Sequence, residues 1–97
     1  YKWPVTVELT DNGKYTKETF TAIFKRVGRK AFEDLDDART AELMDEVLLG
    51  WEDVVDDDGT PIAFTEDMKA ELMDDTYFVR GVMEAYLQSL QGAKAKN

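Results

Sequence analysis

The residues of this chain most able to do chemistry are four closely spaced aspartates, Asp53, Asp56, Asp57 and Asp58. Calcium prefers clustered carboxylates, and calcium-binding loops follow the pattern D-x-[DN]-x-[DN]-G-x5-E. When Gly59 is placed at the loop glycine, the first ligand position holds Val54 and the final glutamate position holds Thr65. Both ends of the loop therefore lack their ligand. Residues 57–61, with their glycine and proline, instead predict a reverse turn.

The rest of the sequence gives little support for catalysis, because it contains no histidine and no cysteine. These absences exclude the commonest general base, thiolate nucleophiles and the usual zinc sites. The six glycines are scattered singly and form no phosphate-binding loop. Paired carboxylates can hydrolyse glycosides, but they need a deep cleft, for which 97 residues leave little volume. We therefore predict no catalytic residue, no metal, no cofactor and no enzymatic activity.

The acidic character of the chain is concentrated in its second half. The formal net charge is −9, and between Thr40 and Ala93 only Lys69 and Arg80 are basic. Nucleic acids and anionic membranes attract clustered Lys and Arg, so we expect neither as a partner. No apolar run is long enough for a bilayer span or a cleavable leader, and we expect neither of these segments. The acidity favours solubility or, alternatively, a small acidic adaptor or inhibitor that binds a basic partner, for example by imitating DNA.

The N-terminal part of the chain has the alternating pattern of a β-hairpin, from about residue 4 to about residue 27. Apolar and polar residues alternate from Val5 to Leu9, and the turn residues Asn12 and Gly13 follow. The segment 19–27 fits either a strand or a helix, and its threonines and aromatics favour the strand. An isolated hairpin is marginally stable, so it either lies on the helices or pairs its edges with another chain. In the second case the self-association edge would contain Val5, Val7, Phe20 and Phe24.

The remainder, about residues 29–92, has the periodicity of about four short to medium helices. A short piece spans 31–35. A longer helix is expected to be capped by Thr40 and ended by Gly50, and it carries an apolar stripe as far as Trp51. Thr65 and Asp75 are expected to cap the last two helices. Residues 93–97 are predicted to be a frayed tail. The sequence thus predicts a single α+β domain over 1–97, mainly α, with an N-terminal hairpin.

Large apolar residues on the helices and beside the acidic turn are either core or a surface that binds an apolar partner. Methionine adapts to variable partners, and Trp and Tyr are frequent interface anchors. The candidate partner-binding residues are Trp51, Val54, Phe64, Met68, Met83 and Tyr86. We also expect Trp51 and Phe64 to fasten the acidic loop to the helices.

Several segments together resemble the tail assembly chaperones of long-tailed, lambda-like bacteriophages (siphoviruses). They are W-E-D-V-V from Trp51, D-G-T-P-I-A-F-T-E from Asp58, E-A-Y-L from Glu84, and the terminal Lys96-Asn97. The opening V-T-V-E-L and the later F-T-A-I-F-K-R-V are similar to the N-terminal hairpin of that family. The resemblance covers nearly the whole chain.

This resemblance implies a non-catalytic role in phage tail morphogenesis. Chaperones of this family coat the tape measure protein in the cytoplasm of the infected or lysogenic bacterium and are absent from the mature virion. A longer form, made by a ribosomal frameshift near the end of the short form, recruits the tail tube protein. The terminal residues 95–97 are compatible with a slippery codon run. We therefore expect a homo-oligomer that binds an amphipathic or apolar helical partner.

Overall fold

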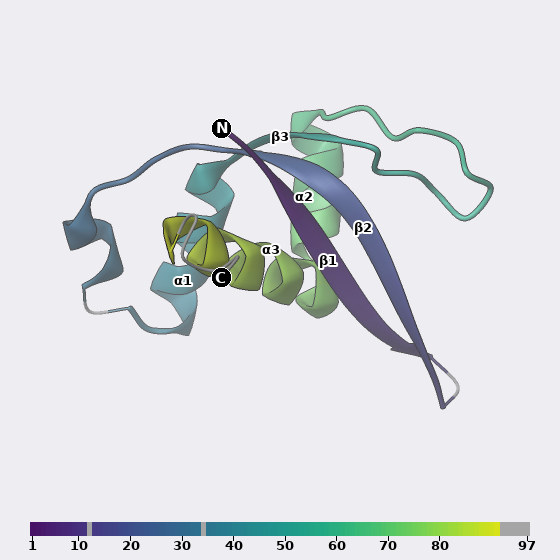
Figure 1. Cartoon of the computed structure of the whole chain (residues 1–97), viewed down its shortest axis with the longest axis horizontal. Coiled ribbons are helices and arrows are strands. Elements are labelled where there is room, and N and C mark those ends of the chain that lie inside the picture. The colour runs from purple at the N-terminus through teal and green to yellow at the C-terminus, as the bar shows by residue number, and fades with distance from the viewer. Residues whose placement is uncertain (12, 34, 92–97) are drawn as a thin grey trace.

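The computed structural model describes residues 1–11, 13–33 and 35–91, without the side chains of residues 10, 11 and 14–16. These residues form an antiparallel sheet in the order β1-β2-β3, together with three α-helices and one short 3₁₀ helix (Figure 1). The elements are β1 (Lys2–Asp11), β2 (Lys14–Phe24), η1 (Arg29–Phe32), α1 (Asp37–Val47), β3 (Leu48–Glu52), α2 (Glu66–Met73) and α3 (Thr76–Gln91). The predicted α+β class is confirmed.

The predicted hairpin is present, and the ambiguous segment after its turn is a strand. β1 and β2 pair over their whole length, from Lys2 opposite Ile23 to Asp11 opposite Lys14. This register leaves a two-residue connection, in which Gly13 has φ +77°. Such a positive φ is easily adopted by glycine, which explains the turn residue at this position.

The helix expected between a Thr40 cap and Gly50 is wrong at both ends. α1 begins earlier, because the carboxylate of Asp36 accepts a hydrogen bond from the backbone N–H of Arg39 at 2.8 Å and caps the helix. The helix ends at Val47, and the next five residues form β3 beside β2. The apolar stripe thus runs from a helix directly into a strand.

β3 pairs with β2 only over the last part of β2, from Thr21 opposite Glu52 to Phe24 opposite Leu48. Gly50 is opposite Ile23, and a β-carbon on this glycine would lie 3.2 Å from the Ile23 side chain. The glycine therefore allows close packing of the two strands. β2 is a central strand in this part of the sheet and an edge strand before it.

α3 crosses one face of the hairpin and closes the core against it (Figure 1). Gly81 makes this close approach possible, because a β-carbon there would lie 2.7 Å from the backbone oxygen of Thr6. The largest fully buried side chains come from the sheet, α1 and α3, and are Val5, Phe24, Met44, Val47, Leu48, Val82 and Tyr86. The hairpin thus lies on a helix, the first of the two arrangements that its marginal stability allowed.

The expected caps of the last two helices are confirmed. The Thr65 hydroxyl accepts from the backbone N–H of Met68 at 3.1 Å, and the Asp75 carboxylate accepts from the N–H of Tyr77 at 2.8 Å. Three α-helices are present in the described chain instead of about four, because the expected piece at 31–35 is the short 3₁₀ helix η1. The expected frayed tail, 93–97, lies outside the described residues. Within the described part of the chain, no helix has the length and apolar character needed to span a membrane.

Candidate functional site

The acidic loop after β3 is a hydrogen-bonded turn centred on Asp56. One carboxylate oxygen of Asp56 accepts from the backbone N–H groups of Asp58 and Thr60, both at 2.9 Å. The N–H of Gly59, which has φ +83°, donates to the Asp56 carbonyl. The predicted reverse turn is therefore confirmed, with Asp56 as its organising residue. Across the described residues, no group of three or more His, Cys, Asp or Glu side chains is placed to hold a metal ion.

Trp51 attaches this loop to the rest of the molecule. Its indole N–H donates to the carbonyl of Ile62 at 2.8 Å. Its ring contacts Phe64 edge-on with centroids 4.7 Å apart, and contacts Phe78 on α3 at 6.2 Å. The expectation that Trp51 and Phe64 fasten the loop is confirmed, and the polar atom of the buried indole is paired as it must be.

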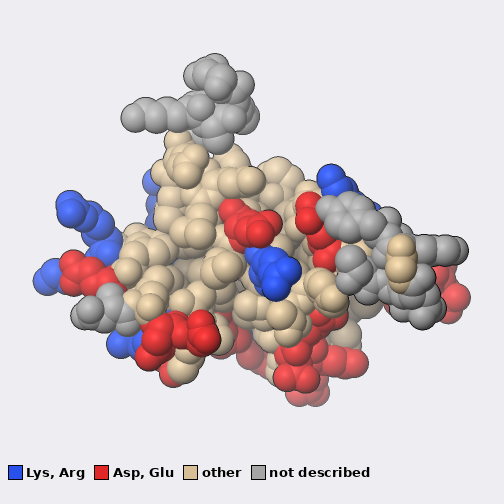
Figure 2. Space-filling view, turned by 90° about the horizontal axis from the view of Figure 1, so that it is seen from below, with Lys and Arg blue, Asp and Glu red and all other residues tan. Residues whose placement is uncertain are grey.

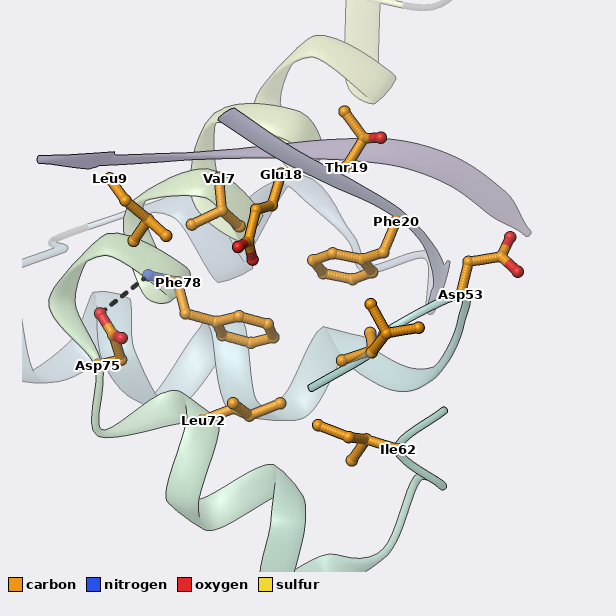
Figure 3. A pocket seen from close by; sticks show the side chains of 12 residues that line it. Val7, Leu9, Glu18, Thr19, Phe20, Asp53, Ile62, Leu72, Asp75 and Phe78 are labelled. Carbon is orange, nitrogen blue, oxygen red and sulfur yellow. Dashed lines mark hydrogen bonds between the residues drawn. The ribbon is translucent and has the colours of Figure 1, made fainter. Parts of the chain in front are cut away.

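The loop, held in this way, forms one wall of an open groove of about 370 Å³ beside the hairpin (Figure 3). Strands β1 and β2 form the opposite wall, and α2 and α3 form the floor. The apolar side chains that line it are Val7, Leu9, Phe20, Val54, Val55, Ile62, Leu72 and Phe78. We call this site the hairpin groove.

The backbone at Asp53 and a pair of stacked phenylalanines shape the hairpin groove. Asp53 has φ +66°, an uncommon conformation for a residue other than glycine, and the chain leaves β2 at this point. Phe20 and Phe78 stack in parallel with ring centroids 5.4 Å apart and are nearly buried. Val55, at the rim, keeps 48% of its surface exposed. The groove thus has a firm aromatic base and an accessible apolar rim.

The charges at the hairpin groove are all negative. Glu18, Asp53 and Asp75 line it, and among the described lining residues none is Lys or Arg. Asp75 also caps α3, whereas Glu18 is opposite Val7 on the inner face of the hairpin. Seen from below, the molecule has a broad uncharged area with acidic side chains along its lower border, one acidic and one basic cluster in its middle, and several basic side chains at the η1 end (Figure 2). The groove therefore suits an apolar segment that also carries positive charge.

Two of the expected partner-binding residues belong to the core. Trp51 is 7% exposed and Tyr86 is fully buried. The Tyr86 hydroxyl donates to the carbonyl of Lys25 at 2.8 Å, and its ring contacts Phe24 edge-on at 5.0 Å. Both side chains have satisfied polar atoms and are enclosed by their neighbours. This placement corrects their assignment to an accessible surface.

The other four expected partner-binding residues are half-buried and are spread over separate places. Val54 lines the hairpin groove, and Phe64 packs on Trp51. Met68 lies on α2 against the core, whereas Met83 lines a separate depression between α1, α2 and α3. The structure therefore does not gather these residues into a single surface.

The four side chains expected at a self-association edge are also placed in the core. Val5 and Phe24 are at most 1% exposed, and Val7 and Phe20 are at most 8% exposed. They are buried because α3 covers the inner face of the hairpin, and because β3 occupies the edge of β2 beside Phe24. These side chains do not form an exposed edge, which corrects that expectation.

The sequence interpretation missed most of the hairpin groove, including Leu9, Glu18, Ile62 and Phe78. One signal for it was present. Counting back along β2 by the strand period from Phe20 places Glu18 on the same inward face. A carboxylate on an otherwise apolar face indicates that the core ends there. Ile62 lies too far along the chain for any local pattern to place it beside the hairpin.

Comparison of the chain with protein-family models, with curated proteins and with solved structures gives no match.

Proposed function

We propose that this chain is a tail assembly chaperone of a long-tailed bacteriophage, which binds the tape measure protein and keeps it soluble during tail morphogenesis. The observation that carries the proposal is the hairpin groove, an open apolar site on a chain of net charge −9. A protein that shields an insoluble client needs apolar contact surface and enough charge to keep the complex in solution. The resemblance of the segments around Trp51, Asp58 and Glu84 to this family supports the same function.

The size of the hairpin groove fits weak binding repeated along a long client. A site of about 370 Å³ accepts few side chains, so affinity for one client segment is low. Many copies along one tape measure protein, joined by self-association, would gain affinity through multivalency. The proposal therefore includes a homo-oligomer, and a longer frameshifted form that brings in the tail tube protein.

The proposed role is non-catalytic and needs no cofactor. It places the protein in the cytoplasm of the infected or lysogenic host during late gene expression, and outside the mature virion. Two of the acidic side chains serve structure, since the carboxylates of Asp56 and Asp75 accept backbone hydrogen bonds.

Co-expression with the tape measure protein of the same phage tests the function. We expect the wild-type chain to move the tape measure protein into the soluble fraction. Val55→Glu, at the rim of the hairpin groove, should reduce that fraction to the level without the chain. Leu87→Glu is a matched control, because Leu87 is similarly exposed (45%, against 48% for Val55) but lies on α3 and does not line the groove. A tape measure protein equally insoluble with and without the wild-type chain would reject the proposal.

The acidic half of the chain supports one alternative, an adaptor or inhibitor that binds a basic partner in the manner of a DNA mimic. The observation in its favour is the scarcity of basic residues after Thr40. Exposed charge pairs weaken as salt shortens the Debye length, whereas apolar contacts persist. Binding of the partner measured from low to high salt separates the two functions, because loss of binding at about 0.5 M salt favours the adaptor.

A further inference from the structure

The two edges of the sheet differ in their ability to accept another strand. On the β1 side, Tyr1 and Phe24 exchange two backbone hydrogen bonds. From this pair onward, the backbone N–H and C=O groups of successive β1 residues point alternately toward β2 and away from it. Counting from Tyr1, the backbone groups of Pro4 and Thr6 point away from β2. Pro4 has no N–H to donate, and the Thr6 oxygen lies against Gly81 of α3. The β1 edge is therefore obstructed along its middle.

The other edge is open where β3 ends. The same alternation directs the backbone N–H and C=O groups of Thr21 and Thr19 away from β1. Thr21 is opposite Glu52 of β3, but Thr19 lies beyond the last paired residue. Asp53, with its positive φ, has already turned the chain away. Among the described residues, no strand lies beside β2 at Thr19.

The hairpin groove lies along this open edge, and Thr19 is among the residues that line it (Figure 3). Side chains of an added strand would point alternately to the two faces of the sheet. Those on the inner face would enter the groove between Phe20, Val54 and Ile62. Backbone pairing and side-chain burial would thus act on the same segment, as in strand addition by peptide-binding domains.

The charges select the composition of the added segment. Glu18 and Asp53 flank the open edge, and neither forms an ion pair with another of the described residues. A Lys or Arg beside the apolar residues of the incoming strand would lie near these carboxylates. An acidic segment would be repelled.

We propose that the β2 edge at Thr19 binds an extended segment of a partner protein, with alternate apolar side chains in the hairpin groove and a basic residue near Glu18 and Asp53. This inference rests on the proposed function, since it specifies how a client segment is held. It differs from the sequence-based expectation of a helical partner. The client is bound as a strand at this site.

The test uses the full chain and three short capped peptides followed by ¹⁵N NMR. The first alternates leucine with threonine and has lysine at both ends. The second is the same peptide N-methylated at the amides that would face β2. The third has the same composition but is locked as a helix by a side-chain staple. We expect the first peptide to shift the Thr19 amide signal and slow its hydrogen exchange, and N-methylation to weaken binding about tenfold.

Every outcome of this titration decides the inference. Absence of binding by the first peptide, tighter binding of the helical peptide, or binding that leaves the Thr19 amide unchanged overturns strand addition. Equal binding of a peptide with glutamate in place of lysine overturns the charge selection. The proposed function is judged separately, by solubility of the tape measure protein with the Val55→Glu and Leu87→Glu variants. A chaperone that passes that test but prefers the helical peptide retains its function and loses this mode of binding.

Discussion

The two ends of the hairpin present the same alternating face to very different surroundings. At the closed end, Val5 and Phe24 are almost completely buried beneath α3. At the open end, Leu9 is half-buried and Glu18 is exposed along the hairpin groove. The strands are continuous and fully paired through both ends. The difference therefore arises from coverage and not from the strands themselves.

Coverage changes the role of an inward-facing residue. Under α3, burial of an apolar side chain stabilises the fold, because the side chain and the helix surface that it contacts both lose their contact with water. Beside the groove the same kind of side chain is half-covered, so part of its hydrophobic free energy is still available to a partner. The inward carboxylate of Glu18 is tolerated because its end of the hairpin stays open to water. The hairpin thus combines a structural end and a candidate binding end.

Truncation of one large side chain at each end is the strongest way to break this comparison. We expect Phe24→Ala to reduce the free energy of unfolding by about 3–5 kcal/mol, because the aromatic ring is buried against Tyr86. Leu9→Ala should cost less than about 1 kcal/mol, because its site is already open to water. Urea denaturation of both variants gives the two values. Similar losses at both ends would show that the groove end is as firmly packed as the core.

A smaller effect is expected from the glycine that brings α3 against the closed end. Alanine at position 81 would place its β-carbon 2.7 Å from the Thr6 oxygen, so α3 must move away from β1. The better helix propensity of alanine, about 1 kcal/mol, offsets part of the overpacking cost of about 1–3 kcal/mol. We therefore expect Gly81→Ala to destabilise the protein by up to about 2 kcal/mol in thermal or urea unfolding.

Gly28→Ala is the matched control for this helix contact. A β-carbon added at Gly28 would meet no neighbouring atom within 4 Å, and alanine adopts the φ of −74° at this position without strain. Because alanine reduces the number of conformations of the unfolded chain, we expect this variant to be as stable as wild type or more stable by up to about 1 kcal/mol. A Gly81→Ala variant as stable as Gly28→Ala would mean that α3 is not held tightly on β1.

Local signals in the sequence were sufficient for the hairpin and the helix caps. The alternation from Val5 and the turn residue Gly13 predicted the hairpin, and the two-residue connection seen in the structure fixes its register. Thr65 and Asp75 were recognised as caps because capping depends on backbone groups two or three residues away. The reverse turn around Asp56 has the same local origin.

β3 could not be recognised from such signals. Leu48 and Trp51 continue the helical spacing of α1. In a regular strand this spacing would place them on opposite faces, and both face inward in β3 because the β2–β3 register shifts between Ile23 and Phe24. The choice is made by hydrogen bonds to β2, which lies more than twenty residues earlier in the chain. Long-range pairing of this kind overrides local propensity. The hairpin groove was missed for the same reason, because it exists only where β3 leaves the sheet at Asp53.

A further modest effect concerns a polar atom at the closed end. The Tyr86 hydroxyl donates to the Lys25 carbonyl in a partly buried hydrogen bond, so Tyr86→Phe leaves that carbonyl without this partner. We expect a loss of about 1 kcal/mol at neutral pH, measured by urea denaturation. A variant as stable as wild type would show that water reaches the carbonyl and that the closed end is less dry than its burial indicates.

The same variant gives a pH test of this enclosure. Burial, followed by the charge of the nearby Tyr1, raises the pKa of Tyr86 above its ordinary value of 10.0. The unfolded chain therefore loses the phenol proton first, and the stability from the protonated phenol falls as pH rises from about 10 through the folded pKa. Phe at this position has no proton to lose. The difference in the free energy of unfolding between wild type and Tyr86→Phe should thus become smaller above about pH 10. Lysine titrations affect both proteins equally and cancel in this difference. A difference that stays constant would place the Tyr86 hydroxyl in contact with water, and the closed end would then resemble the open one.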